Sequence, residues 1–214
     1  KLGEEDRGVD RTLVFVLDVG VVRQGIVVLN GTSAVDDLTF VGHRFGEGGF
    51  KRLMREGVTF ADAEYDYALT STEAGLATFA TGAQPSVHGI IGANWWSHVD
   101  NSRQELIADK RSQPVPFSTG AISCSPHRLQ APTLGDMVVD GIVGGKQITI
   151  AIAPYSAIVL NGRRGVAYWV ERNKTYWTTC AAYAVSLPEW VARYNSDGAN
   201  AFYRIDRWVP KGNI

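Results

Sequence analysis

The stretch Tyr65–Trp96, YDYALTSTEAGLATFATGAQPSVHGIIGANWW, decides how the rest of the chain is interpreted. Three hydroxyl side chains at 70–72 precede a segment of small residues, 74–82, which we expect to be helical. Serine and threonine are favoured helix caps, so one hydroxyl is expected to cap this helix while another points outward. A helix N-terminus presents free backbone N–H groups that favour an anion. A hydroxyl held there beside a metal ion has the surroundings of a nucleophile.

This stretch resembles the alkaline phosphatase superfamily, and within it the bacterial PafA-like phosphatases and the neighbouring type I phosphodiesterase/nucleotide pyrophosphatases. The family reads roughly T-x-T-A-P-G-H-A-T-L-x-T-G-x-x-P-x-x-H-G-I-I-G-N-D-W, and this chain follows it without gaps from Thr70 to Trp95. Further elements typical of the PafA-like set are GGFKRLMREGVTF at 48–60, SPHRLQAPTLGD at 125–136 and LPEWV at 187–191. The resemblance therefore covers residues from about 12 to about 200.

Alternating strand and helix signals predict an α/β fold. Two apolar, β-branched runs are expected to be buried strands: Thr12–Leu17, which ends at Asp18, and Lys146–Ala153. Further strands are expected at 24–29, 58–60 and 175–180, and helices at 48–57, 133–143 and 187–195. We expect a mostly parallel central sheet with flanking helices, as in the N-terminal half of an alkaline phosphatase, plus a small antiparallel excursion near the C-terminus.

The expected domain organisation is a mobile, charged lead-in at 1–11 and a partial alkaline-phosphatase-like α/β domain at 12–214. The resemblance implies that the remaining metal ligands of the family, aspartates and histidines, lie in a C-terminal half beyond Ile214. A partner that completes the domain, or an assembly that covers it, is therefore expected, because half a domain leaves sheet edge and apolar surface uncovered.

The composition of the chain bears on whether it binds nucleic acid, a membrane or zinc. The net charge of −1 gives no reason to expect a nucleic-acid surface, and no apolar run approaches the length of a membrane-spanning helix. The two cysteines, Cys124 and Cys180, lack zinc-ligand spacing; a disulfide and two buried thiols are both compatible with the sequence. The cysteine pair, two Asn-x-Thr triplets and the resemblance together favour a secreted, periplasmic or extracellular location.

The resemblance assigns the chemistry of the site. It implies that Thr72 is the nucleophile that attacks phosphorus, and that two zinc ions activate it. Asp18, at the end of its strand, matches the family's zinc-binding aspartate; a helix cap or turn aspartate is the alternative. Thr72 itself would contact the metal. Asn94 is a candidate phosphate contact. If the chain stays in register with the family pattern, however, the side chain of Asn94 points elsewhere.

Several positions depart from the family pattern. Ala93 stands where the family has an asparagine that donates to phosphate. Ala153 and Tyr155 stand where it has a lysine and an arginine that clamp the phosphate, and neither can give a charge-assisted hydrogen bond to a dianion. Ala74 and Leu76 replace a proline and a histidine in the nucleophile turn. Each transition-state donor removed typically costs about 10²–10³ in rate, so these losses argue against efficient phosphatase activity.

The four histidines do not supply a metal site. His88 lies in the HGII element, where a structural turn histidine is expected, and His98 and His127 are expected on the surface. Zinc takes about four ligands, which Asp18 and Thr72 alone cannot provide.

Two functions follow from the sequence. One is a degenerate, noncatalytic relative that serves as a structural or binding subunit of a larger assembly. The other is half of a split zinc-dependent phosphomonoesterase or phosphodiesterase, acting on a phosphate ester with Thr72 as nucleophile.

Overall fold

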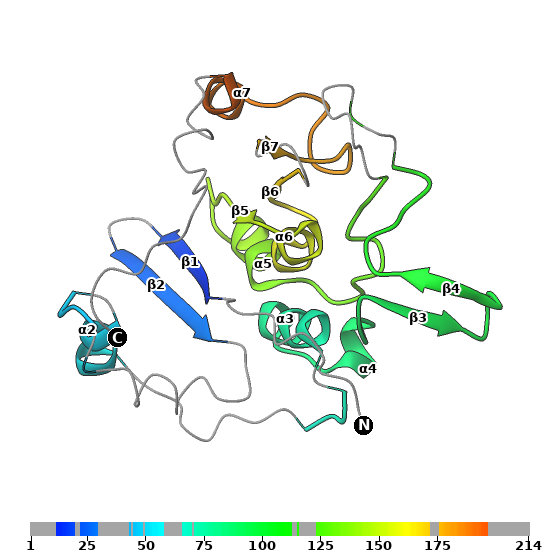
Figure 1. Cartoon of the computed structure of the whole chain (residues 1–214), viewed down its shortest axis with the longest axis horizontal. Helices are drawn as coiled ribbons and strands as arrows, with labels where there is room; N and C mark the ends of the chain where they lie inside the picture. The colour runs from blue at the N-terminus through cyan, green and yellow to red at the C-terminus, as the bar shows by residue number, and fades with distance from the viewer. Residues whose placement is uncertain are drawn as a thin grey trace, which may run out of the picture. The chain divides into compact units, whose positions relative to one another are not determined.

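The computed structural model describes residues 12–19, 22–29, 43, 45–48, 50–57, 66–69, 71–112, 115, 123–171 and 176–196. The chain divides into two units, Lys1–Thr70 and Ser71–Ile214, and each is considered by itself (Figure 1). The expected lead-in at 1–11 and the expected strand at 58–60 lie outside the described residues. The single domain expected from residue 12 to residue 214 stays a prediction.

The described residues of the first unit form an antiparallel pair of strands and a helix. Strand β1, Thr12–Val19, pairs in register with β2, Val22–Leu29, and α2 spans Phe50–Glu56. The expected strands and helix are therefore present, but β1 pairs antiparallel, not in a parallel sheet. The reason is local, because only two residues separate β1 from β2 and a connection that short joins antiparallel strands.

The second unit begins with the helix expected from the central stretch. Helix α3, Thr72–Thr81, ends at Gly82, whose φ of 66° is the left-handed conformation that favours glycine. A short helix follows, α4 at Pro85–His88, and then an antiparallel hairpin of β3, Asn94–Ser97, and β4, Ser102–Glu105. The sequence suggested a loop-rich region after residue 97, so β4 is an addition to the expected fold.

A βαβ unit, in which a helix connects two parallel strands, supports the α/β class. Strand β5, Ile148–Ala151, is followed by α6, Pro154–Asn161, and by β6, Val166–Val170, which is parallel to β5. The short strand β7, Trp177–Thr178, then adds antiparallel to β6, as expected for an excursion near the C-terminus. Helix α6 packs on β5 and β6, and α3 packs against α6 (Figure 1).

Two further helices were expected, at 133–143 and 187–195, and the structure has both with slightly different bounds. Helix α5 spans Leu134–Gly141 and α7 spans Glu189–Ser196. We expected Leu134 and Met137 to point inward, but they are 47% and 53% exposed. That prediction is wrong because the buried face of α5 carries Gly135 and Asp136, whose carboxylate binds backbone groups of a neighbouring turn.

The hydrophobic core of the second unit lies between α6 and β6. Ala157, Ile158, Ala167 and Trp169 are buried there together with the two cysteines. Cys124 and Cys180 are free, buried thiols, and Cys180 Sγ donates to the Cys124 carbonyl oxygen over 3.0 Å. Of the two arrangements compatible with the sequence, the structure therefore has the thiol pair.

Candidate functional site

Two hydroxyl side chains lie at the N-terminus of α3, and one of them caps the helix. Ser71 is the N-cap, and its Oγ accepts a hydrogen bond from the Ala74 backbone N–H over 3.3 Å. Thr72 is the first helical residue and is half-buried. Thr70 lies outside the described residues. The expectation that one of these hydroxyls caps the helix is confirmed by Ser71, and the role of Thr72 stays a prediction.

The cap gives a direct test of this assignment. Because Ser71 satisfies an otherwise unpaired N–H of α3, Ser71→Ala should lower the free energy of unfolding by about 1 kcal/mol. Ser71→Asp keeps an acceptor at the cap and should lose much less. Urea unfolding of both variants measures the difference, and equal losses would show that the hydroxyl does not act as a cap.

The two ends of the central stretch meet in space. A Cβ built on Gly92 would lie 3.8 Å from Ser71 Oγ and 3.8 Å from the Asn94 carbonyl oxygen. The backbone just before β3 therefore lies beside the start of α3. Ala93 and Asn94 themselves are exposed. The phosphate contact of Asn94 stays a prediction, since no described interaction places its amide toward Thr72.

The electrostatics at this helix end are not those of a dedicated anion site. Glu73 places a carboxylate in the first turn of α3, where it complements the helix dipole and disfavours an anionic ligand at this helix end. The end of β5 offers no positive charge in return. It continues through Ala153, the N-cap of α6, into Pro154 at the first helical turn.

The substitutions within α3 are explained by packing. Ala74 is 0% exposed and Leu76 is 3% exposed, and both lie on the buried side of α3. A side chain at either position points into the core of the second unit and not to solvent. The sequence comparison treated these positions as part of the nucleophile turn, and here they serve the contact between α3 and the rest of the fold.

The two expected zinc ligands lie in different units of the chain. Asp18 lies in β1 of the first unit, where only its backbone is described, and Thr72 lies in the second unit. Among the side chains that the structure describes, no three from histidine, cysteine, aspartate and glutamate are grouped as a metal site would need. These residues do not by themselves fit a zinc ion, and the roles of Asp18 and Thr72 toward a metal stay predictions.

His88 is a structural residue, as the sequence indicated. Its side chain is completely buried, Nδ1 accepts from the Ile90 backbone N–H over 3.1 Å, and Nε2 lies 3.1 Å from Thr78 Oγ1. Since Nδ1 accepts, the proton is on Nε2 and is donated to Thr78. Burial lowers the pKa of His88.

His127 is not the free surface histidine that we expected. Its side chain is 26% exposed, and its Nδ1 lies 3.1 Å from Ser125 Oγ and 3.6 Å from Asp109 Oδ2. The Ser125 hydroxyl donates to Asp109 Oδ2 over 2.6 Å, and Arg111 Nε donates to Oδ1 over 2.9 Å. Hydrogen bonds from Arg111 and Ser125 hold the pKa of Asp109 far below its usual value. His98 is exposed, as predicted.

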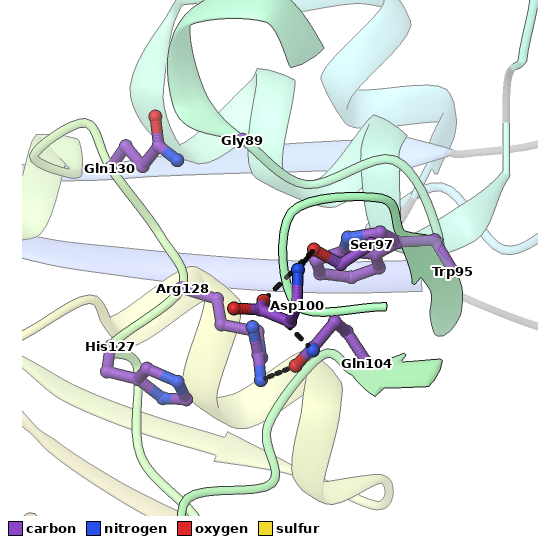
Figure 2. A pocket seen from close by; sticks show the side chains of 8 residues that line it. All are labelled: Gly89, Trp95, Ser97, Asp100, Gln104, His127, Arg128 and Gln130. Atoms are coloured by element: carbon purple, nitrogen blue, oxygen red, sulfur yellow. Dashed lines mark hydrogen bonds between the residues drawn. The ribbon is translucent and has the colours of Figure 1, made fainter. Parts of the chain in front are cut away.

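A pocket with a volume of about 290 Å³ lies next to His127 (Figure 2). The β3–β4 hairpin contributes four of its lining side chains: Trp95, Ser97, Asp100 and Gln104. The rest of the lining comes from Gly89, His127, Arg128 and Gln130. Sequence reasoning missed this pocket because its residues come from segments without a shared motif. The only indication in the sequence was the number of polar residues that follow Trp95 at 97–104.

Comparison with known proteins settles the family. Residues 30–197 match the family described as type I phosphodiesterase / nucleotide pyrophosphatase. The chain belongs to this family. The resemblance inferred from Thr70–Trp95 is thereby confirmed, and so is the α/β fold class. Within the part of the chain that the structure describes, no helix is long and apolar enough to cross a membrane.

Curated relatives and solved structures agree with this placement. The chain is similar to alkaline phosphatase PafA of Elizabethkingia meningoseptica, 27% identical over 77% of this chain and 31% of that protein. It is also similar to alkaline phosphatase PhoV of Synechococcus elongatus, 30% identical over 77% of this chain and 30% of that protein. The chain thus spans about a third of the length of the curated relatives that it matches.

The solved structures are of PafA itself. Wild-type PafA superposes with a TM-score of 0.70 and 28% identity, over 76% of this chain and 32% of PafA. A PafA variant superposes with a TM-score of 0.72 and 26% identity, over 82% of this chain and 35% of the variant. That variant carries a threonine-to-serine change, and an asparagine, a lysine and an arginine are each changed to alanine.

Proposed function

We propose that this member of the phosphodiesterase family is a noncatalytic, alkaline-phosphatase-like protein that acts as a structural or binding subunit. The observation that carries the proposal is the junction of β5 and α6. The family pattern has a lysine and an arginine there, whereas this chain has Ala153 and Tyr155. A phosphoryl group that is transferred needs positive charge or fixed donors around its oxygens, and neither side chain supplies a charge.

The asparagine position supports the same conclusion. Ala93 is exposed and its methyl side chain can donate no hydrogen bond. At positions 93, 153 and 155 the family has an asparagine, a lysine and an arginine that this chain replaces. The PafA variant also has an asparagine, a lysine and an arginine changed to alanine. Glu73, in the first turn of α3, adds a negative charge to the helix end that carries Thr72.

A binding role has a separate support in the apolar surface of β5. Ile148, Ile150 and Ile152 alternate along the chain and are 58%, 54% and 81% exposed. Ile148 and Ile150 lie on one face of β5, and Ile152 follows just after the end of the strand. Such a row of large aliphatic side chains favours contact with an apolar protein surface. We propose that a protein partner covers this face, as expected for a subunit of an assembly at the cell exterior.

The alternative is a split zinc-dependent phosphomonoesterase or phosphodiesterase. It is favoured by the position of Thr72 at the first turn of α3, with Ser71 occupied as the cap. In that case Asp18 and Thr72 would contact zinc, and a second chain would supply the other ligands. The alternative needs a source of positive charge for the phosphate oxygens, since Ala153 and Tyr155 carry none.

Hydrolysis of p-nitrophenyl phosphate and bis-p-nitrophenyl phosphate by the natively purified protein separates the two functions. We expect rates equal to those of Thr72→Ala, with or without added zinc chloride, because the charge-assisted donors are missing. Elemental analysis of the same material measures bound zinc. Hydrolysis that is lost in Thr72→Ala and retained in Thr72→Ser, with zinc bound in stoichiometric amount, would establish the alternative. The combined variant with Ala93→Asn, Ala153→Lys and Tyr155→Arg shows whether the family donors restore activity.

A further inference from the structure

We propose that the pocket between the β3–β4 hairpin and the segment at 127–130 binds a small, neutral, hydroxyl-rich ligand of monosaccharide size. The volume of about 290 Å³ is at the small end of ligand pockets, which suits a single sugar ring better than a larger molecule. The site is separate from Thr72 and does not depend on whether the protein hydrolyses phosphate esters.

The pocket is held in place by a chain of hydrogen bonds before any ligand arrives (Figure 2). Ser97 Oγ and Gln104 Nε2 both donate to Asp100 Oδ2, over 3.0 Å and 3.1 Å. Arg128 donates through Nη2 to Gln104 Oε1 and through Nε to the Glu105 carbonyl oxygen. Side chains that are fixed in this way lose little conformational entropy on binding, which favours recognition of a small ligand.

Donors and acceptors remain available on the same residues. Within the described part of the structure, Asp100 Oδ1 and Arg128 Nη1 take no part in these hydrogen bonds. The Gln130 side-chain amide, which can both donate and accept, is exposed at the pocket. A hydroxyl group also both donates and accepts, so a polyhydroxylated ligand matches this mixture of groups. A ligand that has only acceptors would place an acceptor against the Asp100 carboxylate, which cannot donate.

The hydrogen bonds of His127 leave its Nε2 as a further acceptor among the residues that line the pocket. Because the Ser125 hydroxyl gives its proton to Asp109, Ser125 Oγ accepts from His127 Nδ1, and the other ring nitrogen is left unprotonated. Burial lowers the pKa of His127, although Asp109 opposes this shift, so the ring is neutral near pH 7. The charges that line the pocket are then one carboxylate and one guanidinium, which cancel. This balance selects against a dianion such as phosphate.

Trp95 supplies the apolar surface that sugar rings need on one face. Its ring lies against Arg128, with the guanidinium carbon 5.7 Å from the ring centroid, and it is half-buried at the pocket wall. The C–H groups of a sugar can pack on an indole while its hydroxyls reach the polar side chains. Figure 2 shows the side chains of Trp95, Asp100, Gln104 and Arg128 close together, with Gln130 apart from them.

Gly89 sets the shape of the remaining wall. A Cβ at this position would lie 2.9 Å from two atoms of the Gln130 side chain, and φ is 78°. Gly89→Ala should therefore displace Gln130 and strain the backbone. Gly82 is a matched control: its φ is 66°, but a Cβ there would meet nothing within 4 Å. Gly82→Ala imposes comparable backbone strain without touching the pocket.

A ¹H–¹⁵N NMR titration of the full chain with D-glucose, D-galactose and D-mannose tests the proposal, with inorganic phosphate as the comparison. We expect at least one sugar to give saturable shifts of the Gly89 and Gln130 amides and of the Trp95 indole N–H. Asp100→Asn removes a charged acceptor and should weaken that binding by about tenfold. Gly89→Ala should also weaken it, whereas Gly82→Ala should bind like the wild type.

Three results would overturn the proposal. The first is the absence of saturable shifts with all three sugars in a chain whose spectrum shows that it is folded. The second is that phosphate, and no sugar, shifts these same resonances. The third is that Asp100→Asn leaves sugar binding unchanged, which would place the ligand elsewhere.

Discussion

Asp136→Ala should lower the free energy of unfolding by about 3–5 kcal/mol, more than any surface substitution in the chain. The Asp136 carboxylate is 4% exposed and accepts three backbone hydrogen bonds. Oδ2 accepts from Thr133 N–H over 2.9 Å, and Oδ1 accepts from Arg163 N–H and Arg164 N–H, each over 2.7 Å. Alanine would leave all three donors without a partner.

The cost is large because Asp136 joins two separate elements. It closes the capping box at the start of α5, and it also holds the turn between α6 and β6. Gly162, in that turn, approaches so closely that a Cβ would lie 2.3 Å from Asp136 Oδ2. Losing the carboxylate therefore loosens α5 and the βαβ unit together.

Asp140→Ala is the matched control on the same helix. Asp140 also faces Arg164, but both side chains are more than half exposed, so the pair should contribute no more than about 0.5 kcal/mol. Urea unfolding of Asp136→Ala, Asp140→Ala and the wild type gives the comparison. Similar losses for the two variants would show that the buried carboxylate has no special part in the fold.

Local signals in the sequence were enough to place the capped helices. Ser71 and Thr133 were recognised as hydroxyls in front of helical segments, and both accept the expected backbone hydrogen bonds. The small-residue segment at 74–82 was expected to be helical, and α3 ends at Gly82. These features depend on residues within a few positions of one another, and the physics that fixes them is visible in the sequence.

Contacts between distant segments were not visible in the sequence. Leu134 and Met137 were assigned to the core because they are apolar, but the turn at 162–164 binds Asp136 and so turns the opposite face of α5 inward. His127 was assigned to the surface because its partner, Asp109, lies far away along the chain. Pairing of this kind depends on the tertiary fold, which no local pattern reports.

The antiparallel hairpin of β3 and β4 was missed for a related reason. Its connection, at 98–101, lacks the two-residue Asn-Gly or Asp-Gly turn that predicts a hairpin. The turn is held instead by side chains, with Ser97 Oγ accepting from the Asp100 backbone N–H over 3.2 Å. The pocket that this hairpin helps to form was therefore beyond what the sequence could predict.

His88→Asn should destabilise the protein by about 2 kcal/mol near neutral pH and should flatten its stability at mildly acidic pH. Asparagine can still accept from the Ile90 N–H, but it is too short to reach Thr78 Oγ1 and leaves part of the ring's volume empty. Because burial lowers the pKa of His88, the unfolded chain binds a proton at a higher pH than the folded protein does. Wild-type stability should therefore fall as pH drops through about 6.5.

The pH window separates this effect from others. Below the folded pKa of His88 both states are protonated, so its contribution stops changing there. The pKa of His127 is also lowered, and both the wild type and His88→Asn carry this second contribution of the same sign. The depressed pKa of Asp109 acts only under more acidic conditions, since an unfolded aspartate titrates near pH 3.9. The difference between wild type and His88→Asn therefore isolates the buried ring.

Urea unfolding from about pH 5 to about pH 8 measures that difference, with His98→Asn as the control. His98 is exposed, so its replacement should leave both the stability and its pH dependence unchanged. Should His88→Asn retain the full acid sensitivity of the wild type, the proton taken up on unfolding would belong to another group. The buried imidazole would then bind a proton as readily in the folded protein as in the unfolded chain. Its hydrogen bond argues against this, because Nδ1 accepts from the Ile90 N–H and cannot also carry a proton.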